Sequence, residues 1–161
     1  MRVFGVAGWK NSGKTGLMTR LISHFTKAGL TVASLKHAHH DFDLDQPGKD
    51  SDRHRKAGAG QVLIASERRW ALLTEASPPG LPELLSQLAP NDLVLVEGWK
   101  REPIPKIECH REESANAELL ALSDPNVRAV ASDGHPDVPC PVLQLDDTEA
   151  IAAIKASEVG I

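Results

Sequence analysis

The stretch GWKNSGKT at residues 8–15 limits what this chain can fold into more than any other part of its sequence. It matches the phosphate-loop pattern G-x-x-x-x-G-K-[ST] in full. An apolar, β-branched run at residues 2–7 precedes the pattern, and apolar residues with the spacing of one helical face follow it at residues 17–25. The sequence therefore predicts strand, glycine loop and helix, which is the context in which such a loop binds nucleotide phosphates.

Each residue type in this loop has a chemical reason. Glycine permits a tight curl of the backbone, so that successive N–H groups at the helix start surround an anionic phosphate. Lys14 would neutralise β- and γ-phosphate oxygens, and the Thr15 hydroxyl would bind Mg²⁺. Lys10 stands one residue later than the extra lysine of a related class of phosphate-loop proteins, so a phosphate contact and a solvated side chain both stay open for it. The predicted nucleotide-binding residues of the loop are Gly8, Lys10, Asn11, Ser12, Gly13, Lys14, Thr15 and Gly16.

A segment rich in histidine and aspartate follows a second expected strand at residues 31–36. Strand, helix and strand at this length predict a right-handed βαβ unit, whose strand ends lie at the same sheet edge as the phosphate loop. Three interpretations stay open for residues 37–45: a loop over the γ-phosphate in which Asp43 joins the Mg²⁺ shell, a polar surface loop, and a transition-metal site. The candidates for contacts with phosphate or a partner here are His37, His39, His40, Lys49, Asp50, Ser51 and Arg53.

A fully apolar run at residues 93–96 ends at Glu97. Asp92 precedes the run and would lie ~16 Å away at ~3.3 Å per residue, so only Glu97 can face a ligand at the phosphate-loop edge. Glu97 is the candidate that holds the Mg²⁺ shell or orients an attacking water; the alternative is a carboxylate that caps the strand end.

Two more polar residues are nucleotide-binding candidates by position. Lys100 follows Glu97 closely and is a candidate for a phosphate contact. Asp133 follows an expected strand at residues 127–131 and is a candidate acceptor for the N1 and N2 hydrogens of guanine. The N-K-x-D motif of ordinary GTPases is absent from the sequence.

The remaining pattern predicts a single α/β domain over residues 1–161. We expect a three-layer P-loop NTPase-like fold with a mostly parallel sheet, to which an antiparallel pair could add an extension. Residues 103–108 contain two prolines, which predict an edge strand or a dimer-contacting arm rather than a central strand. The other expected elements are strands at 61–65, 69–74 and 142–145, a helix at 50–58 capped by Asp50 or Ser51, a helix from Leu81 to Leu88, and a last helix capped by Asp147 or Thr148.

Composition narrows the classes of function. Lys plus Arg number 18 against 22 Asp plus Glu, a net charge of −4, so there is no basic excess to predict nucleic-acid binding. No apolar run approaches the ~20 residues of a membrane span, and the N-terminal run is too short for a signal peptide. The two cysteines, Cys109 and Cys140, lie far apart, which is typical of a reduced, cytoplasmic protein.

Several blocks of sequence together resemble the molybdopterin-guanine dinucleotide biosynthesis protein B (MobB) family. They are KNSGKT, then K-H-x-H-H-x-F-D-x-D-x-P-G-K-D-S with R-x-x-x-A-G-A, and later L-V-L-V-E-G-W-K, spanning residues 3–60 and 92–108. The resemblance implies a GTP-binding, weakly hydrolysing, homodimeric adapter in molybdenum cofactor biosynthesis, with GTP and Mg²⁺ as ligands. It also implies a partner, the MobA-type guanylyltransferase that joins guanosine monophosphate to molybdopterin.

Two rival functions stay open from the residues themselves. A small P-loop kinase or synthetase would use the same loop but would need a lid with arginines, and the chain's arginine cluster is at residues 53–55. A metallochaperone GTPase would use residues 37–40 and would need a stoichiometric metal. Enzyme activity also stays open, and at most we expect a slow Mg²⁺-dependent GTPase.

Overall fold

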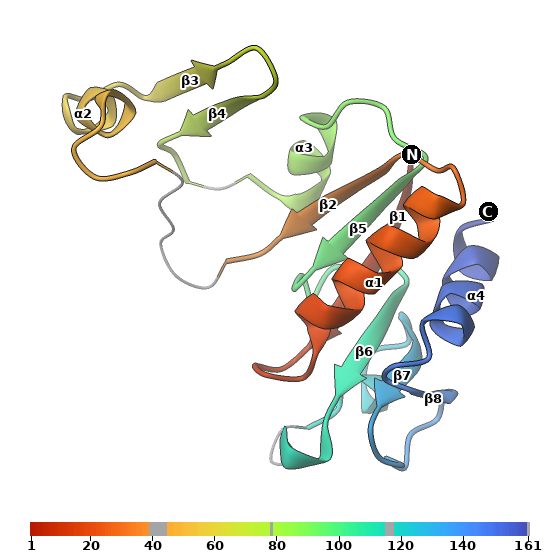
Figure 1. Ribbon diagram of the computed structural model, residues 1–161. Coiled ribbons are helices and arrows are strands. Elements are labelled where there is room, and N and C mark those ends of the chain that lie inside the picture. Colours follow the sequence, from red (N-terminus) through yellow and green to blue (C-terminus); the bar gives the residue numbers. More distant parts are fainter. Residues whose placement is uncertain (39–44, 78, 115–117, 161) are drawn as a thin grey trace. The chain divides into compact units, whose positions relative to one another are not determined.

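The computed structural model describes residues 1–38, 45–77, 79–114 and 118–160 (Figure 1). The chain forms two compact units, one of Met1–His37 with Gln87–Ile161 and one of Ala38–Ser86. Within the described residues, no helix is long and apolar enough to cross a membrane.

The first unit is built on a six-stranded sheet whose neighbouring strands all run parallel. Its spatial order is β2-β5-β1-β6-β7-β8. The α/β class with a mostly parallel sheet is therefore confirmed. The strands are β1 (Arg2–Gly8), β2 (Val32–Lys36), β5 (Leu93–Glu97), β6 (Lys106–His110), β7 (Val127–Ser132) and β8 (Val142–Gln144).

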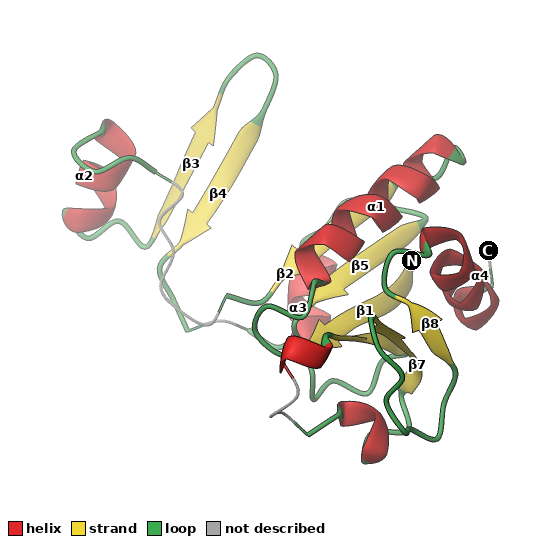
Figure 2. Ribbon diagram, turned by 60° about the horizontal axis from the view of Figure 1, so that its bottom comes forward, coloured by secondary structure: helices red, strands yellow, loops and turns green. Residues whose placement is uncertain are grey.

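One face of this sheet carries the main core, beneath α1 (Lys14–Lys27) and α4 (Thr148–Val159). Figure 1 shows α1 lying over the sheet roughly along the strands, with α4 beside it, and Figure 2 shows the same pair from another side. Every residue of β5 is buried, as expected for a strand covered on both faces. The core comprises Phe4, Val6, Leu17, Met18, Leu21, Phe25, Leu93, Leu95, Ile107, Cys109, Ala129, Ala131, Leu145, Ile151 and Ala152.

The order of the strands places the phosphate loop at a switch point. From β1 the chain passes through α1 to β2, which lies beyond β5 on one side, whereas β6 lies directly on the other side of β1. Open α/β sheets bind ligands at the carboxyl ends of the strands where the order reverses in this way. The loop that follows β1 lies at such a point.

The expectation for residues 103–108 was wrong. Residues 106–110 form β6, which lies in the middle of the sheet between β1 and β7. Both prolines precede the strand, and Pro105 supplies only its carbonyl oxygen, which accepts a hydrogen bond of 2.9 Å from the Gly5 N–H. The strand's own first N–H, at Lys106, donates to Asn126, so the missing proline N–H groups cost the ladder nothing.

The second unit contains α2 (Asp50–Lys56), the antiparallel pair β3 (Gln61–Ala65) and β4 (Trp70–Thr74), and α3 (Leu81–Ser86). The antiparallel pair agrees with the expectation. The expected cap of α2 was wrong, because the helix begins at Asp50 with Lys49 in the cap position and no side-chain cap bond there. Instead, the Asp52 carboxylate reaches back and accepts a hydrogen bond of 2.7 Å from the Gly48 N–H.

Candidate functional site

The phosphate loop takes a backbone path that needs its glycines. Gly8, Asn11 and Gly13 have φ angles of 137°, 63° and 92°, in the range that favours glycine or asparagine. A Cβ on Gly8 would lie 2.4 Å from the Cys109 carbonyl oxygen of the adjacent strand β6 and 2.6 Å from Ser12 Oγ. No side chain larger than hydrogen fits where β1 turns into the loop.

The loop leads into helix α1, whose cap residue is a glycine and so has no side chain to bond to the first N–H groups. Gly13 takes the cap position of α1 in a left-handed conformation, and no side chain there bonds to the first N–H groups. The first helical hydrogen bond runs from the Leu17 N–H to the Gly13 carbonyl oxygen at 3.1 Å. Uncapped N–H groups at a helix start, together with the positive end of the helix dipole, favour an anion at this position.

The ammonium of Lys14 is turned back onto its own loop. Its Nζ donates to the Trp9 carbonyl oxygen and lies 3.4 Å from Ser12 Oγ. Both acceptors are neutral, and partial burial lowers the pKa of Lys14. An anion brought to the loop would therefore offer Lys14 a stronger acceptor than those it has.

Thr15 and Glu97 come from different elements and meet at the carboxyl edge of the sheet. Thr15 Oγ1 donates to Glu97 Oε1 at 3.3 Å. Glu97 is only 8 % exposed, at the end of β5 and in register with Val6 of β1. On the other side, Lys36 of β2 is in register with Glu97, and its Nζ lies 3.7 Å from the same oxygen.

This pair of oxygens fits the predicted Mg²⁺ site in chemical type. A hydroxyl and a carboxylate are hard oxygen donors, and Mg²⁺ in such sites takes few protein ligands and completes its shell with phosphate and water. Thr15 and Glu97 would hold the ion. Asp43, the third predicted ligand, lies outside the described residues.

Lys100 lies against Trp9, which is a residue of the phosphate loop. Lys100 Nζ lies 3.5 Å from the centroid of the Trp9 ring, a cation–π contact. The Trp9 indole N–H donates to the Glu118 carbonyl oxygen at 2.9 Å. Burial lowers the pKa of Lys100, and nearby Lys14 lowers it further, so the two ammonium groups are close enough to repel each other. Lys10, by contrast, is exposed.

Glu108 is a buried carboxylate near this site that the sequence did not single out. It lies in β6, in register with Ala7, and is 0 % exposed. Its two oxygens accept hydrogen bonds of 3.0 and 2.9 Å from the N–H groups of Leu120 and Ala121, at the start of the 3₁₀ helix η2 (Leu120–Leu122). Burial raises the pKa of Glu108. The alternation K-I-E-C-H was visible in the sequence, but the distant N–H partners were not.

Asp133 follows β7 at the same edge of the sheet. Its Oδ1 accepts a hydrogen bond of 2.9 Å from the Glu112 N–H, and its Oδ2 lies 4.0 Å from Arg111 Nη1. Beside it, Ser132 Oγ lies 3.0 Å from His110 Nδ1 and accepts from the Gly134 N–H. The structure thus places Asp133 on the loop that follows β7, in contact with the loop that follows β6. Its role toward a base stays a prediction.

The histidine segment is only partly described. His37 follows β2, and its ring makes an edge-on contact with Trp99 at 5.1 Å between centroids. His39 and His40 lie outside the described residues, so the metal hypothesis for this segment is untested. Among the residues that the structure describes, no three His, Cys, Asp or Glu side chains form a group that could hold a metal.

The other predicted phosphate or partner contacts lie in the second unit. They are Lys49, Asp50, Ser51 and Arg53, before and along the first turn of α2.

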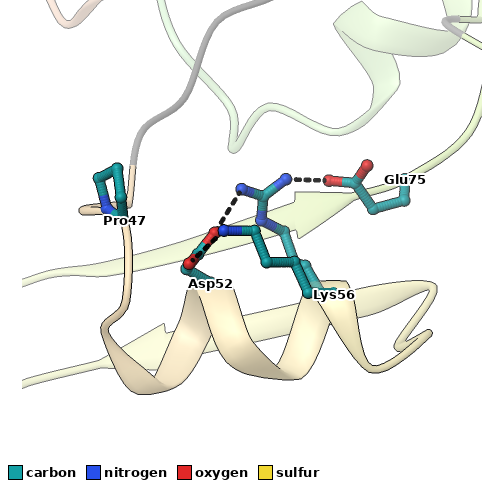
Figure 3. Close-up of a pocket in the computed structure, with 5 residues that line it drawn as sticks. Pro47, Asp52, Lys56 and Glu75 are labelled. Atoms are coloured by element: carbon teal, nitrogen blue, oxygen red, sulfur yellow. Dashed lines mark hydrogen bonds and ion pairs between the residues drawn. The ribbon is translucent and has the colours of Figure 1, made fainter.

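The same helix carries an ion-pair cluster around a pocket of 350 Å³ (Figure 3). Arg55 binds both oxygens of Asp45 at 2.9 and 3.1 Å and donates to Glu75 at 2.8 Å. Lys56 donates to Asp52 at 2.8 Å. These bonds join the segment before α2, the helix itself and the end of β4.

Residues 3–133 match the family model described as MobB, molybdopterin guanine dinucleotide synthesis protein B. The chain is 40 % identical over 153 residues to the molybdopterin-guanine dinucleotide biosynthesis adapter protein of Escherichia coli strain K12, covering 91 % of this chain and 86 % of that protein. It is 39 % identical to the adapter protein of the same description from Haemophilus influenzae, covering 93 % and 85 %.

Solved structures agree on the fold. A MobB homologue from Bacillus stearothermophilus superimposes with a TM-score of 0.76 at 29 % identity, covering 99 % of each chain. The Bacillus subtilis MobB structure gives a TM-score of 0.78 at 24 % identity, covering 99 % of this chain and 98 % of that one.

Proposed function

The chain belongs to the MobB family of molybdopterin guanine dinucleotide synthesis proteins, and from that membership we propose that it is a GTP-binding adapter in the formation of this dinucleotide. Its relatives from Escherichia coli and Haemophilus influenzae are both described as adapter proteins of that biosynthesis. The proposal adds to this description a nucleotide, a metal ion and a partner enzyme.

One observation carries the nucleotide part of the proposal. A helix start with glycine at its cap, Lys14 with neutral acceptors among the described residues, and the Thr15–Glu97 pair at 3.3 Å meet at one point of the sheet edge. The backbone N–H groups and Lys14 would bind the phosphates, while Thr15 and Glu97 would bind Mg²⁺. A bound Mg²⁺ would supply charge compensation for the β- and γ-phosphates.

Guanine is the base we propose, with Asp133 as its acceptor. A carboxylate at this position can accept from N1 and N2 of guanine, whereas adenine presents an unprotonated N1 there. Titration calorimetry with GTP and ATP, each with Mg²⁺, tests both points. Preferential binding of GTP that falls in Asp133→Asn is the expected result, and equal affinities for the two nucleotides would contradict it.

We expect hydrolysis by the isolated protein to be slow. Fast phosphate-loop hydrolysis needs an arginine on the γ-phosphate, often supplied by another protein and worth ~10³–10⁵ in rate. Arg20 of α1 is engaged elsewhere. It donates to the Leu145 carbonyl oxygen at 2.7 Å, in the segment before α4, and to Thr148 Oγ1 at 3.0 Å, in the first residue of α4. Turnover above roughly 1 s⁻¹, the lower end of typical enzyme rates, would favour the rival kinase or synthetase hypothesis instead.

The proposed partners are a MobA-type guanylyltransferase and a second copy of this chain. Support for self-association comes from the β3–β4 pair, where Leu63, Trp70 and Leu72 are 60, 70 and 44 % exposed. Leu63 pairs with Leu72, and Trp70 lies two residues before Leu72, so the three side chains share one face of the pair. Clustered exposed apolar side chains typically mark a protein–protein contact.

A further inference from the structure

Lys36 is a third charged group of the phosphate-loop edge. It is the last residue of β2, one strand beyond Glu97 when counted from the phosphate loop. Two links fix the end of β2 there: Lys36 is in register with Glu97, and the His37 N–H donates to the Glu97 carbonyl oxygen at 2.9 Å. The position of the Lys36 Cα is therefore set by the sheet.

The side chain of Lys36 is largely exposed, although its backbone is held in the sheet. It is 64 % exposed, whereas that of Glu97 is 10 % exposed. Its contact with Glu97 is a loose one, with 3.7 Å between Nζ and Oε1. Only the lysine of this pair is exposed, so its ammonium can turn to another anion once a cation compensates the nearly buried Glu97 carboxylate.

Lys36 and Thr15 both contact the same atom, Glu97 Oε1. That oxygen is one of the two donors that fit Mg²⁺. With Mg²⁺ bound, Glu97 Oε1 would no longer serve as the anionic partner of the Lys36 ammonium. The N–H groups of a phosphate loop surround the α- and β-phosphates, so the γ-phosphate would be the anion left open to Lys36.

We propose that Lys36 is the residue that distinguishes a nucleoside triphosphate from a diphosphate, by contacting the γ-phosphate in place of Glu97. This inference rests on the proposed nucleotide site and adds to it a specificity-determining residue. A diphosphate gives Lys36 no such anion. Lys36 thereby differs from Lys14, which serves both nucleotides through the β-phosphate.

The test is to measure the affinity of Lys36→Met for a non-hydrolysable GTP analogue and for GDP by titration calorimetry, with Mg²⁺. Loss of a charge-assisted contact weakens triphosphate binding by about tenfold or more, whereas GDP affinity stays within about threefold. Lys36→Arg keeps the charge and should retain most of the triphosphate preference. Lys27→Met, at the far end of α1 and exposed, is the matched control and should change neither affinity.

Three other outcomes separate the hypotheses. Equal weakening for both nucleotides would overturn the proposal, because Lys36 would then act only through general charge. Unchanged affinities for both would overturn it too, leaving Lys36 as a counter-ion of Glu97. If the unmodified protein binds neither nucleotide, the proposed function itself fails, and that result is visible before any variant is made.

Discussion

Lys14 binds the carbonyl of Trp9 and the hydroxyl of Ser12, both in its own loop. Replacing it by alanine breaks no ion pair among the described residues, so the fold should survive. It would remove the proposed charge-assisted contact to phosphate, and such a contact is worth about 1.5–3 kcal/mol. We expect Lys14→Ala to weaken GTP binding by about tenfold to a hundredfold, measured by calorimetry with the melting temperature as a control. Binding within threefold of the unmodified protein would contradict the phosphate-loop assignment.

Glu97 allows a second test at the residue scale. Glu97→Gln keeps the size of the side chain and an oxygen for the Thr15 hydroxyl, but removes the charge that would hold Mg²⁺. We expect GTP turnover to fall by about 10²-fold, the lower end of what such groups contribute, while the melting temperature changes little. Glu67→Gln, in the exposed turn of the second unit, is the control. An unchanged turnover rate would make Glu97 a structural carboxylate.

A motif in the sequence could name single residues of the candidate site, and their roles toward a nucleotide stay a prediction. Gly8, Lys14 and Thr15 follow from a contiguous pattern, and Glu97 from its place at the end of an apolar strand. Glu108 could not be found this way, because its two N–H partners lie 12 and 13 residues further along the chain. A lone glutamate in a segment with two prolines looks solvated until the partner strand is known.

At the scale of elements, β6 shows where prediction from the sequence stops. Apolar runs without proline, such as those of β1 and β5, were located correctly because a buried parallel strand needs little else. For β6, proline anywhere in residues 103–108 predicts against a central strand, whereas only residues inside the ladder must donate hydrogen bonds. The order of the strands also lay beyond the sequence, because pairing between distant segments leaves no local pattern.

The packing of α4 on α1 gives a testable element. Lys155 of α4 is 0 % exposed, its Nζ lies 3.7 Å from the Phe25 ring centroid of α1, and it has no hydrogen-bond partner among the described residues. Burial lowers the pKa of Lys155 to about 7. We expect Lys155→Met to raise the free energy of unfolding by about 1–3 kcal/mol at pH 7, since an unsatisfied buried polar group is removed.

The pH dependence of this effect has a definite sign. The unfolded chain keeps the lysine proton up to a pKa of ~10.4, whereas the folded chain releases it from about pH 7 upward. The cost of burying the charged ammonium is therefore complete below pH 7 and disappears as the pH rises toward 10. Denaturant melts at pH 7 and pH 9.5 should show the advantage of Lys155→Met shrinking at the higher pH. A constant difference between the two proteins would contradict the burial of a neutral amine.

At the scale of the whole molecule, the phosphate loop and the apolar face of Leu63, Trp70 and Leu72 belong to different units. We expect the chain to sediment as a dimer and Trp70→Glu to weaken the dimer by at least about thirtyfold, equivalent to about 2 kcal/mol for a central aromatic contact. GTP affinity should not change, because the loop lies in the other unit. Arg68→Glu, in the exposed turn that joins β3 to β4, is the control. A monomeric unmodified protein would contradict this prediction.

The contact between Trp9 and Lys100 has an optical consequence. Indole emission responds in intensity and colour to a charge held over the ring, and here an ammonium lies 3.5 Å from the ring centroid. If Lys100 turns to a phosphate, that charge leaves, and the fluorescence of Trp9 should shift. The chain has three tryptophans and no tyrosine, so a Trp70→Phe, Trp99→Phe background would leave Trp9 as its only indole. The protein then carries its own fluorescent reporter of ligand binding, within the loop that would bind the ligand.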